Sequence, residues 1–168
     1  MEDRSPEIIT EMMEARGYSI TERESDKMLA VNEADHQILI IFIEEPKLNI
    51  NTVKDLVAIL QENELDHAII VYNDSITSSA RKTIESIEDI TIETFLRTEL
   101  QYNITQHRLQ PLFEKCSGEE AKEIKDKWGT KIPVMLKTDP IARFYNYSRG
   151  DIIRVTRKNG FVAYRIVR

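Results

Sequence analysis

The stretch that decides the fold is KMLAVNEADHQILIIFIEEPK, residues 27–47. Two apolar runs flank the polar segment NEADH, and this pattern predicts a β-hairpin. The second run, residues 38–43, is apolar without interruption, so both faces of that strand are apolar. Strands of this kind normally lie inside a sheet that is covered on both sides. The stretch therefore predicts a hairpin whose second strand lies inside a sheet.

The segment before the hairpin predicts a helix with well-marked ends. Ser5 is placed to cap it, Pro6 suits its first turn, and Gly17 suits a left-handed exit. Apolar residues recur between these ends at spacings of three and four, which gives one apolar stripe. They are Ile8, Ile9, Met12, Met13 and Ala15.

Strands and helices alternate after the hairpin. Residues 51–63 have helical spacing with Asn51 or Thr52 as the cap, and residues 67–73, HAIIVYN, predict a short buried strand. A helix capped by Ser78 or Ser79 follows, and then a third strand in DITIETFL, residues 89–96, which runs into a brief helix. This order predicts a mainly parallel sheet with helices on its faces, an α/β module.

A second, α+β module follows the connector NITQHRLQP, so we expect domains at residues 1–105 and 106–168. Ser117 and Glu120 stand at the positions of a capping box. IPVML predicts a strand, and Asp139 followed by Pro140 predicts the start of a short helix. The last segment predicts a β-hairpin whose tight primed turn is Asn159-Gly160.

Charge separates the two ends of the chain. Residues 131–168 hold nine lysines and arginines and two acids, a net charge of +7. The whole chain has 23 basic and 29 acidic residues, so the rest holds 14 and 27, a net charge of −13. Opposite electrostatics predict two modules with different partners.

Several classes of protein are not indicated by the composition. No run approaches the ~18 apolar residues of a membrane helix, and the first residues lack the pattern of a secretory signal. The single cysteine, Cys116, has no internal partner, and His36, His67 and His107 are too scattered for a metal site. We expect an intracellular protein without a structural metal, whose histidines lie at the surface or at strand ends.

The C-terminal residues resemble the C-terminal domain of the fifth subunit of eukaryotic RNA polymerases, which archaeal polymerases possess as a free-standing subunit. The resemblance rests on an ordered set: Pro133, residues 139–145 (DPIARFY), Arg149-Gly150, Ile152, Ile153, Val155, Arg157 and residues 164–167 (YRIV).

The N-terminal half is similar to the eukaryotic or viral form of the same family. The similar stretches are FIEEPKLNINTVKDL, ELDHAIIVYNDSITSSARKTI and FLRTELQYNITQHRLQP. Three features depart from the family: Ser78 replaces a proline, Asn146 replaces a glycine, and the final hairpin loop is cut to residues 158–160. These departures suggest a large DNA virus or a divergent eukaryote as the source.

The resemblance implies a non-catalytic subunit of a DNA-directed RNA polymerase that binds no cofactor and performs no chemistry itself. It implies that the N-terminal module, a three-layer fold related to restriction endonucleases, forms part of the lower jaw near downstream DNA. The C-terminal module is expected to dock on the largest subunit, in the nucleus if the source is cellular and in the virion or at a host-cell transcription site if it is viral. The expected assembly residues are Pro133, Asp139, Pro140, Arg143, Phe144, Arg149, Gly150, Arg157, Tyr164 and Arg165.

The basic tail permits two readings, nucleic-acid binding through phosphates or docking on an acidic partner. The family resemblance favours docking, with Arg143 and Arg149 around Phe144, Tyr145 and Tyr147 as the best interface candidates.

Near DNA, the candidate contacts are Thr77, Ser78, Ser79, Ala80 and Arg81, which would read the backbone and not the sequence. A plain helix cap explains the serines equally well.

A free nucleic-acid-binding or nuclease-related protein is the alternative from a different class. Asp35, Glu45 and Lys47 are the residue types with which nucleases hold Mg²⁺ and orient water. Pro46 tends to end a strand and would displace Lys47 from the position that this chemistry needs. The other reading is that residues 44–47 simply turn the chain from strand to helix.

Overall fold

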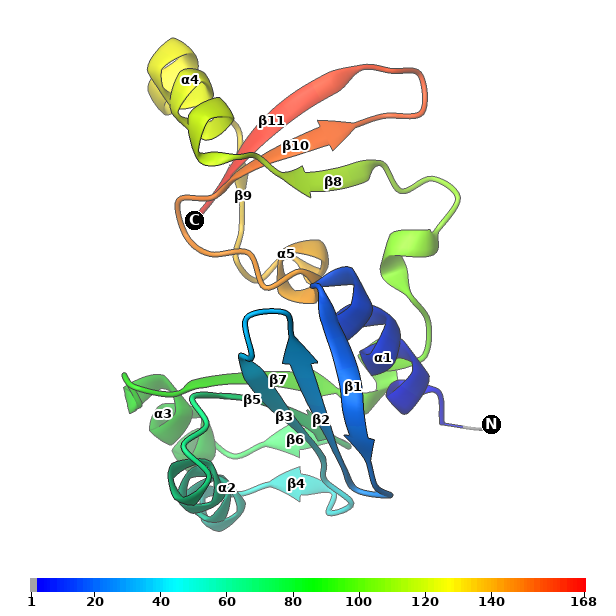
Figure 1. Ribbon diagram of the computed structural model, residues 1–168, viewed down its shortest axis with the longest axis vertical. Coiled ribbons are helices and arrows are strands. Elements are labelled where there is room, and N and C mark those ends of the chain that lie inside the picture. Colours follow the sequence, from blue (N-terminus) through cyan, green and yellow to red (C-terminus); the bar gives the residue numbers. More distant parts are fainter. Residues whose placement is uncertain (1–2) are drawn as a thin grey trace. The chain divides into compact units, whose positions relative to one another are not determined.

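The computed structural model describes residues 3–168. It divides into two compact units, of which the first ends at Tyr102 and the second begins at Asn103. Each unit has its own sheet and its own helices (Figure 1). In the described part of the chain, every helix is too short or too polar to cross a membrane.

The first unit is built on a five-stranded mixed sheet with the order β1-β2-β3-β5-β7. Pairs β1–β2 and β2–β3 are antiparallel, whereas β3–β5 and β5–β7 are parallel. The predicted hairpin and the two later strands are confirmed, but the prediction of a mainly parallel sheet is wrong for half of the pairs. The strands are β1 (Tyr18–Arg23), β2 (Lys27–Asn32), β3 (Gln37–Phe42), β5 (His67–Tyr72) and β7 (Thr91–Leu96).

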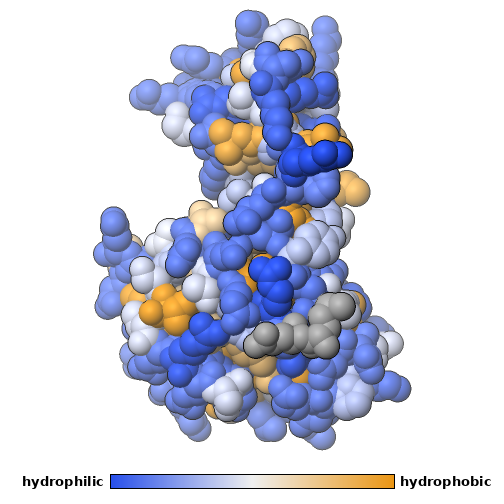
Figure 2. Space-filling model, turned by 90° about the vertical axis from the view of Figure 1, so that its right-hand side faces the viewer, coloured by the Kyte–Doolittle hydropathy of each residue, from blue (hydrophilic) through white to orange (hydrophobic). Residues whose placement is uncertain are grey.

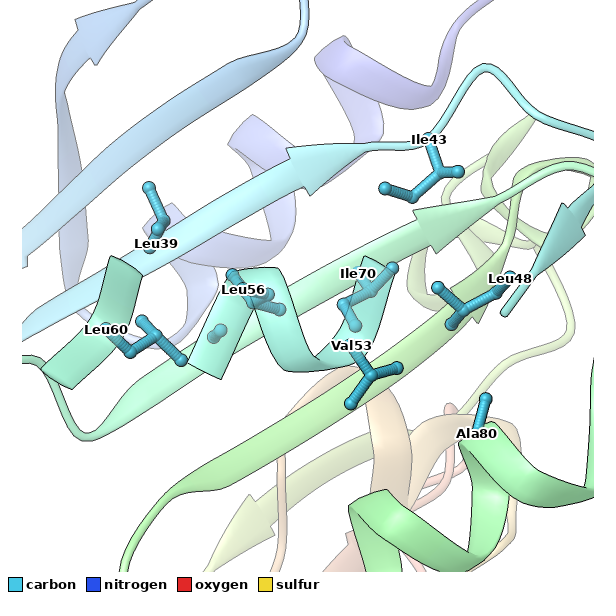
Figure 3. Close-up of a cluster of buried hydrophobic side chains, with 9 residues drawn as sticks. Leu39, Ile43, Leu48, Val53, Leu56, Leu60, Ile70 and Ala80 are labelled. Carbon is cyan, nitrogen blue, oxygen red and sulfur yellow. The ribbon is translucent and has the colours of Figure 1, made fainter. Parts of the chain in front are cut away.

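Helices α2 and α3 pack on one face of this sheet and bury a cluster of aliphatic side chains (Figure 3). Val53, Leu56 and Leu60 point from α2 toward Leu39 on β3 and Ile70 on β5. Their spacing of three and four places them on one side of α2, as predicted. The elements on this side are α2 (Ile50–Glu62), α3 (Ser78–Ser86) and the two-stranded parallel sheet of β4 (Lys47–Leu48) and β6 (Ser75–Ile76).

The opposite face of the sheet is buried too. Ile38, Ile40 and Phe42 alternate along β3 with the residues that face α2, so they point to the other side. Helix α1 (Ser5–Ala15) packs against β1. It buries Ile8, Ile9, Met12 and Met13, which is the predicted apolar stripe without Ala15. The uninterrupted apolar run of β3 thus marks a strand that is covered on both faces, as predicted.

Three predicted helix caps are wrong by one to three residues. At α1 the N-cap residue is Arg4, which makes no side-chain cap bond, and the Asp3 carboxylate accepts from the Ser5 amide at 3.0 Å. Asn49 caps α2 and Thr77 caps α3, each accepting a backbone amide on its side-chain oxygen. In each case the polar side chain that accepts the amide lies one to three residues N-terminal to the predicted cap, because several residues of the capping type stand close together.

The second unit is a four-stranded mixed sheet with the order β8-β10-β11-β9. The predicted terminal hairpin, β10–β11, is confirmed as antiparallel, and β9 joins β11 in parallel. The elements are η2 (Ile104–Gln106), β8 (Leu112–Lys115), α4 (Gly118–Trp128), η3 (Gly129–Lys131), β9 (Val134–Met135), α5 (Pro140–Phe144), β10 (Ile152–Thr156) and β11 (Val162–Val167).

Both faces of this second sheet are covered. Ile153, Val155 and Val167 pack with Ile141 and Ala142 of α5 on one face. Ile152, Tyr164 and Ile166 pack with Ala121 and Ile124 of α4 on the other. The small unit therefore has two apolar layers of its own.

The tight turn of the hairpin differs from its prediction. Gly160 has φ +83°, but Asn159 does not have a positive φ, so the primed turn is wrong. The Gly160 amide donates to the Arg157 carbonyl at 2.9 Å, and the Asn159 side chain accepts from the Phe161 amide. A hydrogen-bonded turn followed by one left-handed glycine is the usual form of a three-residue hairpin loop.

Candidate functional site

The predicted assembly residues divide into those that build the second unit and those that lie on its surface. Asp139 caps α5 by accepting the Ile141 amide at 2.9 Å, as predicted. Gly150 has φ +90° and its amide donates to the Val167 carbonyl at 2.9 Å. The Pro133 carbonyl accepts the Ile166 amide at 2.9 Å. Asp139 through its side chain, and Gly150 and Pro133 through their backbone, contribute to the fold of the second unit.

The aromatic residues proposed around Arg143 and Arg149 are mostly internal. Phe144 and Tyr147 are 4% and 6% exposed, and the half-buried Tyr145 ring contacts both of them, edge-on with Phe144 and stacked on Tyr147. Burial raises the pKa of Tyr147, so this phenol stays neutral. A buried ring contributes to folding and has little surface that a partner could contact. The Phe144 and Tyr147 side chains are therefore poor candidates for direct contacts with a partner.

Exposed cations remain on the second unit as candidate contacts. Arg149, Arg157 and Arg165 are exposed, whereas Arg143 is half-buried. Arg154 was not predicted as a contact and is engaged within the unit: its guanidinium lies 3.2 Å from both Glu114 and Glu120. The tail thus keeps most of its positive charge on the surface.

Ser117 caps α4 as predicted, but the reciprocal half of the capping box is replaced. Its hydroxyl accepts the Glu120 amide at 3.3 Å, while the Glu120 carboxylate reaches Arg154 and also accepts from the Tyr164 hydroxyl at 3.4 Å. Tyr164 is therefore a half-buried positioning residue between the strand and α4. Beside it, burial raises the pKa of the Cys116 thiol to about 11, which leaves that thiol protonated and unreactive at neutral pH.

The candidate DNA-proximal loop lies where β6 enters α3. The Thr77 hydroxyl accepts the Ala80 amide at 3.2 Å, and Ala80 itself is fully buried in the apolar cluster under α3. Ser78, Ser79 and Arg81 are exposed. The structure removes the Ala80 side chain from the possible contacts and assigns Thr77 to the helix cap.

Asp35, Glu45 and Lys47, the residues that would form a nuclease site, do not lie together in the structure. Asp35 lies in the β2–β3 turn with φ +63°, before β3 begins, and Glu45 lies beyond the other end of that strand. A six-residue strand spans about 20 Å, which is too far for two carboxylates to share a metal ion. Lys47 opens β4 and pairs with β6 instead of extending β3, as the proline predicts. Within residues 3–168 no group of three or more metal-ligating side chains gathers.

A buried ionic cluster in the first unit was not predicted. Glu93 of β7 accepts both guanidinium nitrogens of Arg16 at 2.8 Å and lies 2.8 Å from His67 Nε2. His67 is the first residue of β5, which agrees with its predicted place at the surface or at a strand end, and it is buried at 7% exposure. A second series of side-chain hydrogen bonds lies beside this cluster. The Tyr18 hydroxyl is 2.9 Å from His36 Nδ1, and His36 Nε2 is 2.9 Å from the Asp66 carboxylate. Arg16 and His67 both bond to the Glu93 carboxylate, and such mutual pairing of buried side chains is typical of a structural network.

Comparisons with known proteins agree with the resemblance read from the sequence. Residues 102–167 match the family model described as RNA polymerase Rpb5, C-terminal domain. The putative DNA-directed RNA polymerase subunit 454R of Invertebrate iridescent virus 6 is 37% identical, with each chain covered completely. The subunit rpabc1 of DNA-directed RNA polymerases I, II and III from Dictyostelium discoideum is 29% identical over 99% of this chain and 90% of that protein.

Among solved structures, the EndoMS-dsDNA2 complex is similar at 21% identity and a TM-score of 0.40, covering 56% of this chain and 44% of that chain. This likeness is too low to support an argument about the fold.

Proposed function

The chain belongs to the Rpb5 family of DNA-directed RNA polymerase subunits, and we propose that it serves its polymerase through two modules with separate partners. It is a subunit of a multisubunit DNA-directed RNA polymerase. The observation that carries this function is the viral relative, a putative polymerase subunit that matches from end to end at 37% identity. The subunit performs no chemistry of its own in this proposal, and it works in the nucleus if the source is cellular or in the virion or infected cell if it is viral.

The C-terminal domain, residues 106–168, docks on the largest polymerase subunit. Support comes from the exposed arginines of this domain and its net charge of +7, which suit an acidic partner surface. The exposed pair Arg149 and Arg165 is the best place to test docking, because neither side chain belongs to the apolar layers.

Charge reversal tests this docking. We expect the double variant Arg149→Glu with Arg165→Glu to be lost from the largest subunit on co-purification, since like charges at an interface repel. A matched control reverses the exposed pair Arg81 and Lys82 of the first unit and should stay bound. Full retention of the first variant in moderate salt, with normal thermal unfolding, would reject the docking surface.

The N-terminal domain, residues 1–105, forms part of the lower jaw near downstream DNA. The mixed sheet with helices on both faces is compatible with the three-layer, restriction-endonuclease-related fold expected for a jaw. Ser78, Ser79 and Arg81 provide hydroxyls and charge at the surface of the α3 start. They would contact the DNA backbone without reading its sequence.

Crosslinking within an assembled elongation complex tests the jaw. A photoreactive residue at Ser78 or Ser79 should crosslink to downstream duplex DNA, whereas the same residue at the exposed Ser25 of the β1–β2 turn should not. Absence of any crosslink from both loop positions would remove the DNA contact and leave the docking proposal unaffected.

A further inference from the structure

We propose that a groove between α4 and β11 binds an acidic peptide segment that carries a bulky apolar side chain. The groove has a volume of about 450 Å³ and lies entirely within the second unit. This inference goes beyond the proposed function, because it specifies the chemistry of a further ligand. Binding of that ligand can be measured with the subunit alone, outside the polymerase.

One side of the groove is formed by α4 and by η3, which follows it. Ile124, Lys127, Trp128 and Lys131 line it at successive spacings of three, one and three. Ile124, Lys127 and Trp128 stand at i, i+3 and i+4 and therefore share one face of α4, while Lys131 joins them from η3, after the left-handed Gly129. Lys122 and Asp126 lie two residues to either side of Ile124, where the helix turns them away from this wall.

The other side of the groove is the outer end of β11. Phe161 and Val162 line it and are 57% and 41% exposed, while Trp128 across from them is 47% exposed. Large apolar side chains that stay this exposed together mark an interaction site rather than a core. Trp128 therefore does more than pack α4 on the sheet, since about half of this side chain is exposed to solvent.

The apolar surface continues past the groove onto the edge of the sheet. Val134 of β9 pairs with Ile166 of β11, so the two side chains share the face that carries Val162 and Tyr164. Val134 is 45% exposed and Leu136, just after β9, is 61% exposed. An extended peptide segment along this edge would therefore meet apolar surface beyond the groove itself.

The positive charge around the groove indicates an acidic ligand. Two lysines, Lys127 and Lys131, are among the ten residues that line the groove, and none of the ten is acidic. The guanidinium of Arg157 lies 5.5 Å from the Phe161 ring and adds a third cation at the rim. An acidic segment is complementary to this rim, and its apolar side chain would bury the exposed floor.

A single-stranded nucleic acid fits the groove less well. Base stacking needs open aromatic faces. Here Lys127 lies over Trp128 at 5.3 Å and Arg157 over Phe161, so each ring already has a cation of this chain on one face. The rest of the apolar lining is largely aliphatic, including Ile124, Ile132 and Val162, and aliphatic surface suits a leucine or phenylalanine anchor.

The groove in the first unit provides an internal contrast. It has a volume of about 320 Å³ and combines apolar residues with Glu22, Glu24 and Lys27. Lys27 lies 3.3 Å from Glu24, so the pair leaves Glu22 as a net negative charge at that rim. Both grooves are apolar, but only the second-unit groove has a rim that attracts acids.

Tryptophan fluorescence of the full chain tests the proposal, because Trp128 is the single tryptophan. The probe is a short synthetic peptide of aspartates and glutamates around a central Phe-Leu pair. We expect saturable binding with a blue shift of the Trp128 emission, and weaker binding as salt rises. Peptides with Ala-Ala at the centre, or with lysines in place of the acids, should bind at least about tenfold more weakly.

Two variants localise the binding, and each has a matched control. Val162→Asp places a carboxylate in the groove and should weaken binding about tenfold or more, whereas Leu112→Asp, at an exposed position of β8, should change it less than about twofold. Lys127→Glu with Lys131→Glu should have the same effect as Val162→Asp. The control is Lys122→Glu with Lys125→Glu, which makes the same charge change on α4 but outside the groove.

Three outcomes would overturn the proposal: no saturable binding, equal binding of the lysine peptide, or binding that Val162→Asp leaves unchanged. Tighter binding of a single-stranded oligonucleotide with the same variant pattern would also overturn it and assign the groove to nucleic acid. Loss of docking on the largest subunit is measured separately at Arg149 and Arg165, so failure of one proposal does not imply failure of the other.

Discussion

Glu93 illustrates how one carboxylate ties three elements of the first unit together. It lies in β7 and is bonded to Arg16, just after α1, and to His67, the first residue of β5. The side chains of Arg16 and His67 are 5% and 9% exposed and that of Glu93 is 12% exposed. Removing one partner of such a group leaves an uncompensated buried charge on the others.

We therefore expect Glu93→Gln to lower the free energy of unfolding by about 3 kcal/mol, measured by urea denaturation at pH 7. The exposed Glu88→Gln should cost less than about 0.5 kcal/mol. An equal, small effect of both substitutions would mean that the cluster contributes little to stability.

The same carboxylate makes stability depend on pH. Burial alone would raise the pKa of Glu93, but hydrogen bonds from His67 and Arg16 outweigh burial and hold this pKa below its usual 4.5. A group with a lowered pKa stabilises the fold above its unfolded-state pKa and loses that contribution as pH falls through its folded-state pKa. The stability gap between wild type and Glu93→Gln should therefore be full near pH 7 and narrow below about pH 4.5.

This cluster could not be predicted from the sequence, for a physical reason. Arg16, His67 and Glu93 are far apart along the chain, and each one alone resembles a surface residue. Nothing local records that the sheet order brings β5 and β7 together beside the end of α1. By contrast, Asn146 stands where the family has a glycine, and its left-handed φ of +51° depends on a local preference, because asparagine tolerates this conformation better than most residues.

Asn146 gives a second prediction at the scale of one residue. A left-handed φ costs an ordinary L-residue roughly 1 kcal/mol and costs glycine nothing. Asn146→Ala should therefore lower the free energy of unfolding by about 1 kcal/mol, while Asn146→Gly should leave it unchanged or raise it slightly. Thermal unfolding of both variants checks this order, and a more stable alanine variant would contradict it.

At the scale of one element, α3 shows which polar residue begins a helix. Thr77 accepts the Ala80 amide, whereas the adjacent Ser78 and Ser79 are inside the helix and exposed. Thr77→Ala should destabilise the first unit by about 1 kcal/mol, and Ser78→Ala should change its stability by less than about 0.5 kcal/mol. Urea denaturation measures the free energy of unfolding of both variants. A larger loss of stability for Ser78→Ala would mean that Ser78 caps the helix, as the sequence predicted.

The elements that the sequence predicted share strong periodicity or an uninterrupted apolar run. Strands β3 and β5 and helices α1 and α2 belong to this group. Strand β1 was missed because four of its six residues are exposed, so YSITER carries no apolar pattern for its place at the sheet edge. The turn at Gly160 was assigned the wrong type, because an Asn-Gly pair suits more than one hairpin loop.

At the scale of the whole molecule, the sequence pattern identified the family more sharply than it identified the contacts. The residues that carry the resemblance in the second unit are largely those that shape its backbone or core, such as Asp139, Phe144 and Gly150. A pattern needed for folding is recognisable in the sequence, but it does not state which exposed side chains meet a partner. The groove of α4 and β11 was missed for the same reason, since its walls come from two distant segments.

The second unit should fold and dock without the first. It has its own four-stranded sheet with an apolar layer on each face, and domains of 55–65 residues often fold alone, although with small margins of about 5 kcal/mol. We expect residues 103–168 to show dispersed amide signals by NMR and a cooperative thermal transition.

In co-purification, this fragment should bind the largest polymerase subunit and carry the same sensitivity to Arg149→Glu with Arg165→Glu, while a fragment ending at Tyr102 should not bind. The two fragments also differ in charge, since residues 103–168 carry 14 basic and 7 acidic side chains and residues 1–102 carry 9 and 22. Docking of the acidic fragment alone would therefore mean that electrostatic attraction to the basic unit is not what holds the subunit in its polymerase.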